Sequence, residues 1–149
     1  MNTRRTLTLC LLISVMLTAC EGPFMNLPGG KLAGTPTPVP DSWAFTDEVD
    51  TIQLETNPAE PYSVNIWVAA MGEFLYVHAG DNRAEWVANM QANPRVRLQV
   101  EDAIYELAAE RVTDQAEFTR FGDAYAEKYY GRPGNENVSE AYLFRLTAR

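Results

Sequence analysis

The sequence predicts a mainly β domain of the α+β class, in which six antiparallel strands form a small barrel and two helices cover its openings. Three observations favour this fold. Apolar and polar residues alternate along six short stretches, which is typical of strands. Apolar residues recur with helical spacing in two other stretches, and turn-forming residues separate these segments. A β-sandwich of the same strands is the alternative.

The first three strands are expected over residues 51–56, 62–70 and 74–79. Ile52 and Leu54 share one face of the first strand, because side chains alternate along a strand. Residues 57–61 contain two prolines and are expected to form a turn. The short connection at residues 71–73 predicts that the second and third strands pair as a hairpin.

A short helix is expected after the third strand. Asn82 is its expected cap, with Glu85 as the return partner of a capping box. The helix is expected to end at Asn93, because proline disfavours helix at the residue before it. The remaining strands are expected over residues 95–100, 104–112 and 141–147.

A longer helix is expected between the last two strands. Asp114 is its expected cap, again with Glu117 in return. Aromatic residues recur at helical spacing and predict one buried face: Phe118, Phe121, Tyr125 and Tyr129. Gly131, Pro133 and Gly134 follow closely and are expected to end the helix.

The first residues have the three parts of an export signal. Arg4 and Arg5 are basic, residues 7–16 are largely apolar, and small residues precede Cys20. The apolar stretch is shorter than the ~18–20 residues that cross a bilayer. Residues 17–20, Leu-Thr-Ala-Cys, resemble the lipobox of bacterial lipoproteins. A short buried helix in a cytosolic protein is the alternative, and Sec and twin-arginine export both stay open.

The lipobox resemblance implies that residues 1–19 are a signal peptide and that Cys20 becomes an acylated, palmitate-type anchor in the cell envelope. The lipid bilayer is then a partner, and the protein faces the periplasm or the cell exterior. Residues 20–42 are rich in proline and glycine and are expected to form a tether without regular structure. The barrel domain is then expected over residues 43–149.

Cleavage would change both the charge and the cysteine content. Loss of Arg4 and Arg5 leaves 10 basic against 20 acidic side chains, a formal charge of −10. This balance argues against nucleic acid as a partner. Loss of Cys10 leaves only Cys20, so stability is expected to come from an apolar core rather than from disulfides.

A stretch in the middle of the chain resembles a known family. Tyr76-Val77 leads into Ala79-Gly80, and Trp86, Asn89 and Ala92-Asn93-Pro94 follow, with Val96 after them. This order is similar to that of the pyridoxamine-phosphate-oxidase-like split β-barrels, especially the deazaflavin-dependent nitroreductases. The resemblance covers roughly residues 51–149. It implies a split barrel, a homodimer, and FMN, a deazaflavin or occasionally haem at the subunit interface.

The chain departs from that family at one turn. Deazaflavin-binding relatives carry a Gly-Arg-Lys-Ser-Gly-like turn that helps to hold phosphate. The corresponding residues 57–61 read Asn-Pro-Ala-Glu-Pro, with no basic side chain and one acid. This difference argues against phosphate binding at the turn.

Six positions are candidate cofactor-binding groups: Ser63, Asn65, His78, Gly80, Arg83 and Trp86. His78 shares a strand face with Tyr76 and is expected at a barrel mouth or pocket, as a flavin contact or proton donor. Free amides at a helix start favour anions, and Arg83 can add a charge-assisted contact. Trp86, like Trp67, can stack on a ring.

Each candidate also has an ordinary structural role. Asn82 can simply cap the helix, Trp86 can be core, and Ser63 and Asn65 can face solvent on the sheet. Arg95 and Arg97 are expected on a solvated face, paired with Glu106 or Glu110. A single histidine excludes a multi-histidine metal site, so no metal is predicted and no catalytic residue is assigned.

Two functions remain open from the sequence. The first is a membrane-anchored flavin- or deazaflavin-type oxidoreductase of a small substrate, in which the cofactor carries the chemistry. The alternative is a cofactor-free, tethered ligand-binding or interaction domain with no catalytic activity. The missing basic turn favours the alternative, whereas the family resemblance favours the oxidoreductase.

Overall fold

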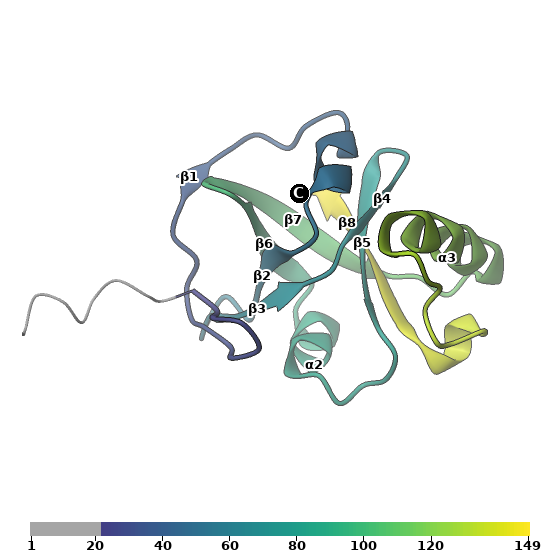
Figure 1. Cartoon of the computed structure of the whole chain (residues 1–149). Helices are drawn as coiled ribbons and strands as arrows, with labels where there is room; N and C mark the ends of the chain where they lie inside the picture. The colour runs from purple at the N-terminus through teal and green to yellow at the C-terminus, as the bar shows by residue number, and fades with distance from the viewer. Residues whose placement is uncertain (1–21) are drawn as a thin grey trace, which may run out of the picture.

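The structure, a computed structural model, describes residues 22–149 (Figure 1), so the signal sequence and Cys20 lie outside the described residues. Its strands are β1 (Thr35–Pro36), β2 (Ile52–Thr56), β3 (Tyr62–Ile66), β4 (Ala69–Met71), β5 (Phe74–Ala79), β6 (Arg95–Val100), β7 (Ala103–Arg111) and β8 (Tyr142–Ala148). Its helices are α2 (Glu85–Ala92) and α3 (Gln115–Tyr129), with 3-10 turns η1 (Ala44–Glu48) and η2 (Val138–Glu140).

The strands form one curled, mostly antiparallel sheet in the order β3-β2-β6-β7-β8-β5-β4. Its first and last strands, β3 and β4, are joined by only two residues, Trp67 and Val68. The sheet must therefore curl back on itself, as Figure 1 shows. The expected mainly β barrel with two helices is confirmed, with eight strands in place of six because β1 was not expected and one expected strand is divided.

The divided strand is the one expected over residues 62–70. β3 pairs with β2, whereas β4 pairs with β5, so the expected hairpin forms only through Ala69–Met71. Between them the backbone of Val68 bonds to side chains of α3. The Val68 N–H donates to the Tyr129 hydroxyl (3.0 Å), and Lys128 Nζ donates to the Val68 carbonyl (2.8 Å). These contacts replace strand pairing and let the chain leave one edge of the sheet for the other.

Tyr129→Phe is expected to destabilise the fold by about 1–2 kcal/mol, because it leaves the part-buried Val68 N–H without its acceptor. Urea unfolding followed by circular dichroism measures this loss. Tyr130→Phe is the matched control and is expected to change the free energy of unfolding by less than about 0.5 kcal/mol, since Tyr130 is exposed. Equal effects of the two variants would contradict this role of Tyr129.

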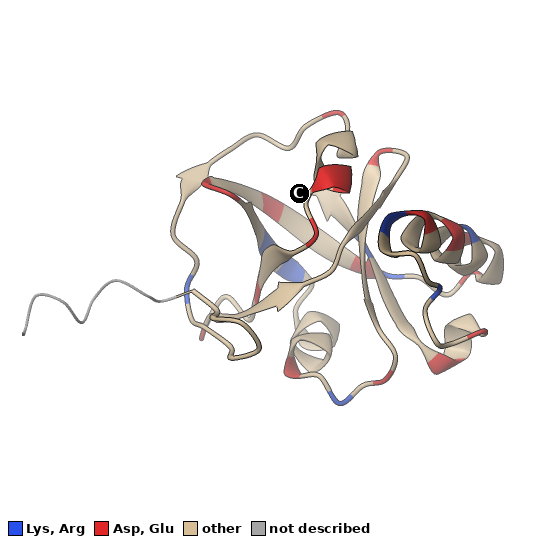
Figure 2. Ribbon diagram, in the orientation of Figure 1, with Lys and Arg blue, Asp and Glu red and all other residues tan. Residues whose placement is uncertain are grey.

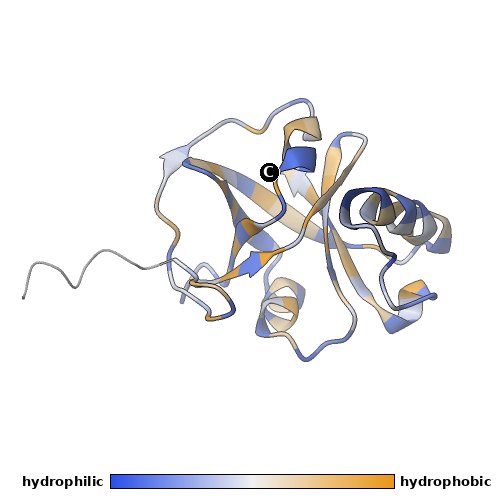
Figure 3. Ribbon diagram, in the orientation of Figure 1, coloured by the Kyte–Doolittle hydropathy of each residue, from blue (hydrophilic) through white to orange (hydrophobic). Residues whose placement is uncertain are grey.

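Two apolar clusters hold the barrel together. The larger one fills its interior and includes Leu54, Leu98 and Leu107, which are fully buried. The smaller one lies between β5, β8 and α3, where Tyr76 and Phe121 pack with ring centroids 6.0 Å apart. Apolar residues alternate along the strands accordingly (Figure 3). Phe118 and Phe121 of α3 are buried, so the aromatic face expected on the longer helix is confirmed at these two positions.

The cap of α3 is the one expected from the sequence, whereas the cap of α2 is not. Asp114 caps α3 as expected, because its Oδ1 accepts from the Glu117 N–H at 2.7 Å. The Glu117 carboxylate does not complete a capping box with the backbone N–H of Asp114. It accepts a hydrogen bond from the Tyr76 hydroxyl at 2.8 Å. Asn82 as cap of the shorter helix is wrong, since α2 begins at Glu85 after Ala84. Asp81 instead closes its own turn by accepting from the backbone and side chain of Arg83.

The expected tether is a packed element, which we call the N-terminal strap (residues 22–37). Leu32 is buried, and the backbone groups of Leu32 are held by Glu55 and Arg97 of the sheet. Pro36 fits because parallel pairing with β7 uses only the N–H groups on either side of it, from Thr35 and Thr37. This stretch is thus held against the sheet, although its regular secondary structure is confined to the two-residue strand β1 and isolated bridges.

Gly34 has a steric reason to be glycine. A Cβ at this position would lie 2.5 Å from the Asp102 carbonyl oxygen, which belongs to the β6–β7 turn. The strap can therefore approach the turn closely enough for the Thr35 N–H to donate to that same carbonyl at 2.6 Å.

Within residues 22–149, none of the helices has the length and apolar character needed to cross a membrane.

Candidate functional site

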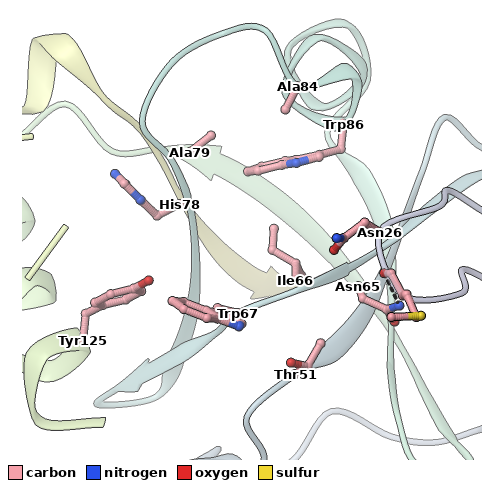
Figure 4. A pocket seen from close by; sticks show the side chains of 11 residues that line it. Asn26, Thr51, Asn65, Ile66, Trp67, His78, Ala79, Ala84, Trp86 and Tyr125 are labelled. Atoms are coloured by element: carbon pink, nitrogen blue, oxygen red, sulfur yellow. Dashed lines mark hydrogen bonds between the residues drawn. The ribbon is translucent and has the colours of Figure 1, made fainter. Parts of the chain in front are cut away.

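A cavity of about 630 Å³ opens where β3, β5, both helices and the N-terminal strap meet (Figure 4). Its walls are Met25, Asn26, Thr51, Asn65, Ile66, Trp67, His78, Ala79, Ala84, Trp86 and Tyr125. Such a volume is in the range of small-molecule and cofactor sites. The lining is largely apolar and aromatic, with a few amide, hydroxyl and imidazole groups.

Two tryptophans frame the cavity. Trp86 reaches in from α2 and Trp67 lies on the other side of Ile66 (Figure 4). Trp86 is mostly buried and meets Phe144 edge-on, with centroids 6.3 Å apart. Trp67 is 54% exposed and stacks nearly parallel on Tyr129 at 4.8 Å. The division of strand 62–70 therefore also places Trp67 at the rim, because the same tyrosine holds the backbone of Val68.

His78 is the polar group of greatest chemical interest in the cavity. Its ring packs beside Phe121 and Tyr125, with centroids 5.7 and 6.5 Å away. Its Nε2 is buried without a hydrogen-bond partner. Burial lowers the pKa of His78 below its ordinary value, although the Asn135 side chain opposes the shift. The imidazole is therefore neutral at pH 7, and its unpartnered Nε2 is enclosed by protein while the ring forms part of the cavity wall.

The lowered pKa of His78 has a consequence for stability. Below pH 6.5 the unfolded chain takes up the imidazole proton before the folded chain does. The free energy of unfolding should therefore fall as the pH drops from 6.5 towards the lower folded-state pKa. His78→Gln is expected to flatten this part of the profile, as measured by urea unfolding at several pH values. An unchanged slope in the variant would count against a buried, neutral His78.

The structure brings together only some of the positions expected from the sequence. Asn65, His78 and Trp86 line the cavity, and Gly80 follows the lining residue Ala79 but is itself exposed. Two others lie elsewhere. Ser63 is buried beneath the strap, where its backbone pairs with Gly29, and Arg83 is exposed and bonded to Asp81.

Several lining residues escaped sequence reasoning. Met25 and Asn26 come from the strap, which was expected to carry no structure. Asn65 holds this part of the strap in place by donating from Nδ2 to the Met25 carbonyl at 2.8 Å. Tyr125 offered a signal, since it continues the aromatic face of α3 beyond Phe121. No local pattern pointed to Met25 or Asn26.

A second hollow of about 310 Å³ gathers basic side chains beside the turn at residues 57–61. Lys31, Arg95, Arg97 and Arg149 line it together with Glu55 and Glu106. The solvated pairing expected for Arg97 is wrong: it forms a largely buried bidentate pair with Glu55, at 2.6 and 2.8 Å. Glu106 pairs instead with Arg149. The cationic groups therefore gather near a turn that itself has none.

Comparison with known proteins agrees with this architecture. Residues 66–133 match the family model described as F420H(2)-dependent quinone reductase. This stretch includes β5, α2 and β6, and therefore the walls formed by His78, Ala79 and Trp86. No curated protein matches the chain.

Three solved structures of similar fold illustrate the likeness. A conserved hypothetical protein from Mycobacterium tuberculosis is 22% identical, with a TM-score of 0.59 over 71% of this chain and 77% of that one. A candidate pyridoxamine 5′-phosphate oxidase from Listeria innocua is 13% identical, with a TM-score of 0.55 over 70% and 87%. An FAD-binding protein from Mesorhizobium loti is 19% identical, with a TM-score of 0.50 over 69% and 83%.

These likenesses and the curled sheet agree with the sequence resemblance. That resemblance is therefore confirmed: the chain has the split-barrel fold of the pyridoxamine-phosphate-oxidase-like and deazaflavin-dependent nitroreductase-like proteins, and residues 66–133 match the F420H(2)-dependent quinone reductase model.

Proposed function

We propose that this protein is an envelope lipoprotein whose cavity binds the ring system of a flavin or deazaflavin and serves the reduction of a small substrate. The observation that carries the proposal is the cavity itself, with Trp67 and Trp86 at its walls and the ring of His78 beside them. The matching quinone reductase family and the FAD-binding neighbour support it.

The residues present fit the ring better than they fit a phosphate. Aromatic walls suit a planar heterocycle, and the side chains of Asn26 and Asn65 can hydrogen-bond to its polar edge. No lysine or arginine is among the lining residues. The basic hollow lies at the far end of β2, about 16 Å along the strand at 3.3 Å per residue. Recognition in the cavity is therefore expected to come from the ring.

A bound flavin or deazaflavin would supply hydride transfer at this site. The chain's own groups bind and orient it. Trp86, fixed against Phe144, offers a rigid face, and Trp67 narrows the opening. His78 is neutral at pH 7 because burial lowers its pKa, so its ring contributes to the cavity wall without adding charge.

Titration of the mature protein in detergent with riboflavin, FMN and an F420-type deazaflavin tests this function. Absorbance changes and thermal unfolding report binding, and a ligand at 100 times its Kd should add about 2.7 kcal/mol of stability. We expect riboflavin and FMN to bind within about tenfold of each other, since no lining cation contacts the phosphate. Absence of binding by all three would contradict the proposal and favour a cofactor-free interaction domain.

The anchor and the assembly belong to the same proposal. The lipobox at residues 17–20 supports acylation of Cys20, and the fold family supports a homodimer. Cys20→Ala is expected to leave the protein unlipidated and released from membranes, as measured by membrane fractionation and mass spectrometry. Continued membrane association of an unlipidated variant would contradict the anchor.

A further inference from the structure

A short apolar turn of the strap stands out from the surface. Phe24, Met25 and Leu27 are 68%, 72% and 66% exposed, although all three are large apolar side chains. We call residues 24–27 the apolar turn. It is closed by two backbone hydrogen bonds between Phe24 and Leu27, at 2.9 and 3.1 Å. The three side chains are thus presented by a defined backbone, and such clustering is typical of an interaction site.

The apolar turn is fixed relative to the barrel. Gly29 exchanges two backbone hydrogen bonds with Ser63 of β3, at 2.8 and 2.9 Å. Asn65 of the same strand donates to the Met25 carbonyl at 2.8 Å. Glu55 and Arg97 hold Leu32 further along the strap. Whatever binds the apolar turn therefore also sets the orientation of the barrel.

Chain length places the apolar turn next to the proposed anchor. Phe24 follows Cys20 by four residues, which span at most about 14 Å even when fully extended. Each polar headgroup region of a bilayer is about 5–7 Å thick, on either side of a hydrocarbon core of about 30 Å. If the sulfur of Cys20 carries acyl chains, the strap is too short to hold residues 24–27 far from the lipid.

The charge pattern agrees with this position. None of the nine residues from 22 to 30 carries a charged side chain, and Lys31 is the first charged residue of the strap that the structure describes. This is unusual in a mature chain of formal charge −10, whose acids are spread over the other surfaces (Figure 2). An uncharged, apolar segment can enter the membrane interface without the repulsion that acidic groups meet at anionic lipids.

We infer that the apolar turn inserts into the membrane interface and that the barrel lies against the bilayer with its cavity beside the lipid surface. Met25 and Asn26 belong both to the apolar turn and to the cavity wall. The cavity is therefore accessible to molecules dissolved in the membrane. This inference rests on the proposed acylation of Cys20, and it replaces a spacer role for the strap with a docking role.

Site-directed spin labelling of the acylated protein tests the inference. The mature chain has no free thiol once Cys20 is acylated, so Leu27→Cys provides a single labelling site. Ala33→Cys is the matched control, because Ala33 is exposed on the same strap beyond the apolar turn. Both proteins are reconstituted in vesicles of phosphatidylcholine and phosphatidylglycerol. Accessibility to a water-soluble nickel complex and to oxygen then reports the depth of each label.

We expect the label at residue 27 to be roughly fivefold less accessible to the nickel complex than the label at residue 33, and more accessible to oxygen. Equal nickel accessibility in an acylated, vesicle-bound protein would overturn the inference and leave the anchor intact. Absence of fatty acid by mass spectrometry would overturn the anchor and the inference together. Ligand binding measured in detergent is independent of both and judges the proposed cavity function separately.

Discussion

Glu55→Ala is expected to destabilise the protein by about 3–5 kcal/mol, because it leaves the mostly buried guanidinium of Arg97 without its carboxylate. Glu55 accepts two hydrogen bonds from Arg97 and one from the Leu32 N–H. Arg97 cannot escape the loss by becoming neutral, because a guanidinium group stays protonated even without a carboxylate beside it. The same substitution is expected to release the N-terminal strap.

Chemical unfolding measures the stability loss, and limited proteolysis of the strap measures its release. Glu106→Ala is the matched control, because its pair with Arg149 is largely exposed and is expected to contribute less than about 1 kcal/mol. If the two variants had the same free energy of unfolding and the same resistance to proteolysis in residues 22–37, this result would contradict the role of the Glu55–Arg97 pair in holding the strap.

Trp86→Ala is expected to cost about 3–5 kcal/mol of stability and to weaken ring binding at least about tenfold, since one side chain serves both the core and the cavity wall. Trp43→Ala is the matched control. Trp43 is buried against Tyr105, 4.9 Å away edge-on, and does not line the cavity. It should cost similar stability and leave the affinity of the ring unchanged.

Stability comes from urea unfolding of the two variants, and affinity comes from absorbance titration with riboflavin. If either alanine variant fails to fold, Trp86→Phe and Trp43→Phe provide the same comparison with a smaller loss of core volume. A loss of affinity shared by both tryptophan variants would mean that binding follows general stability. If the ring binds in the cavity, only the Trp86 variants are expected to lose affinity for riboflavin.

Local patterns predicted the elements whose causes are local. Residues 95–100 alternate strictly between polar and apolar positions, and residues 74–79 form a short, largely apolar run after a turn; the structure places β6 and β5 there. Asp114 caps α3 because its side chain reaches an N–H three residues on, a contact that depends on no other element. The fold class followed from such segments together with the family resemblance.

Non-local contacts explain what the sequence did not predict. The break at Trp67 and Val68 depends on Tyr129 and Lys128, which lie some sixty residues further along the chain. The order of the strap depends on Glu55 and Arg97 in the same way. Proline and glycine remove local reasons for structure, but they do not prevent a segment from being held by the sheet that it crosses.

The candidate site was partly foreseen for the same reasons. His78 was expected at a barrel mouth or pocket from strand alternation, and Trp86 was a candidate for stacking on a ring; the structure places both in the cavity wall. Ser63 shares its strand face with Asn65, yet the strap covers it and removes it from the site. Met25 was missed because its part in the cavity exists only once the strap is docked.

The central claim is that the cavity binds a flavin-type ring between the side chains of Trp67 and Trp86. The three tryptophans of the chain give three indole N–H signals in a nitrogen–proton correlation spectrum of the mature protein in micelles. Riboflavin should shift the signals of Trp67 and Trp86 along one saturation curve and leave the signal of buried Trp43 in place. Saturating riboflavin that moved none of the three, or moved only that of Trp43, would contradict the account.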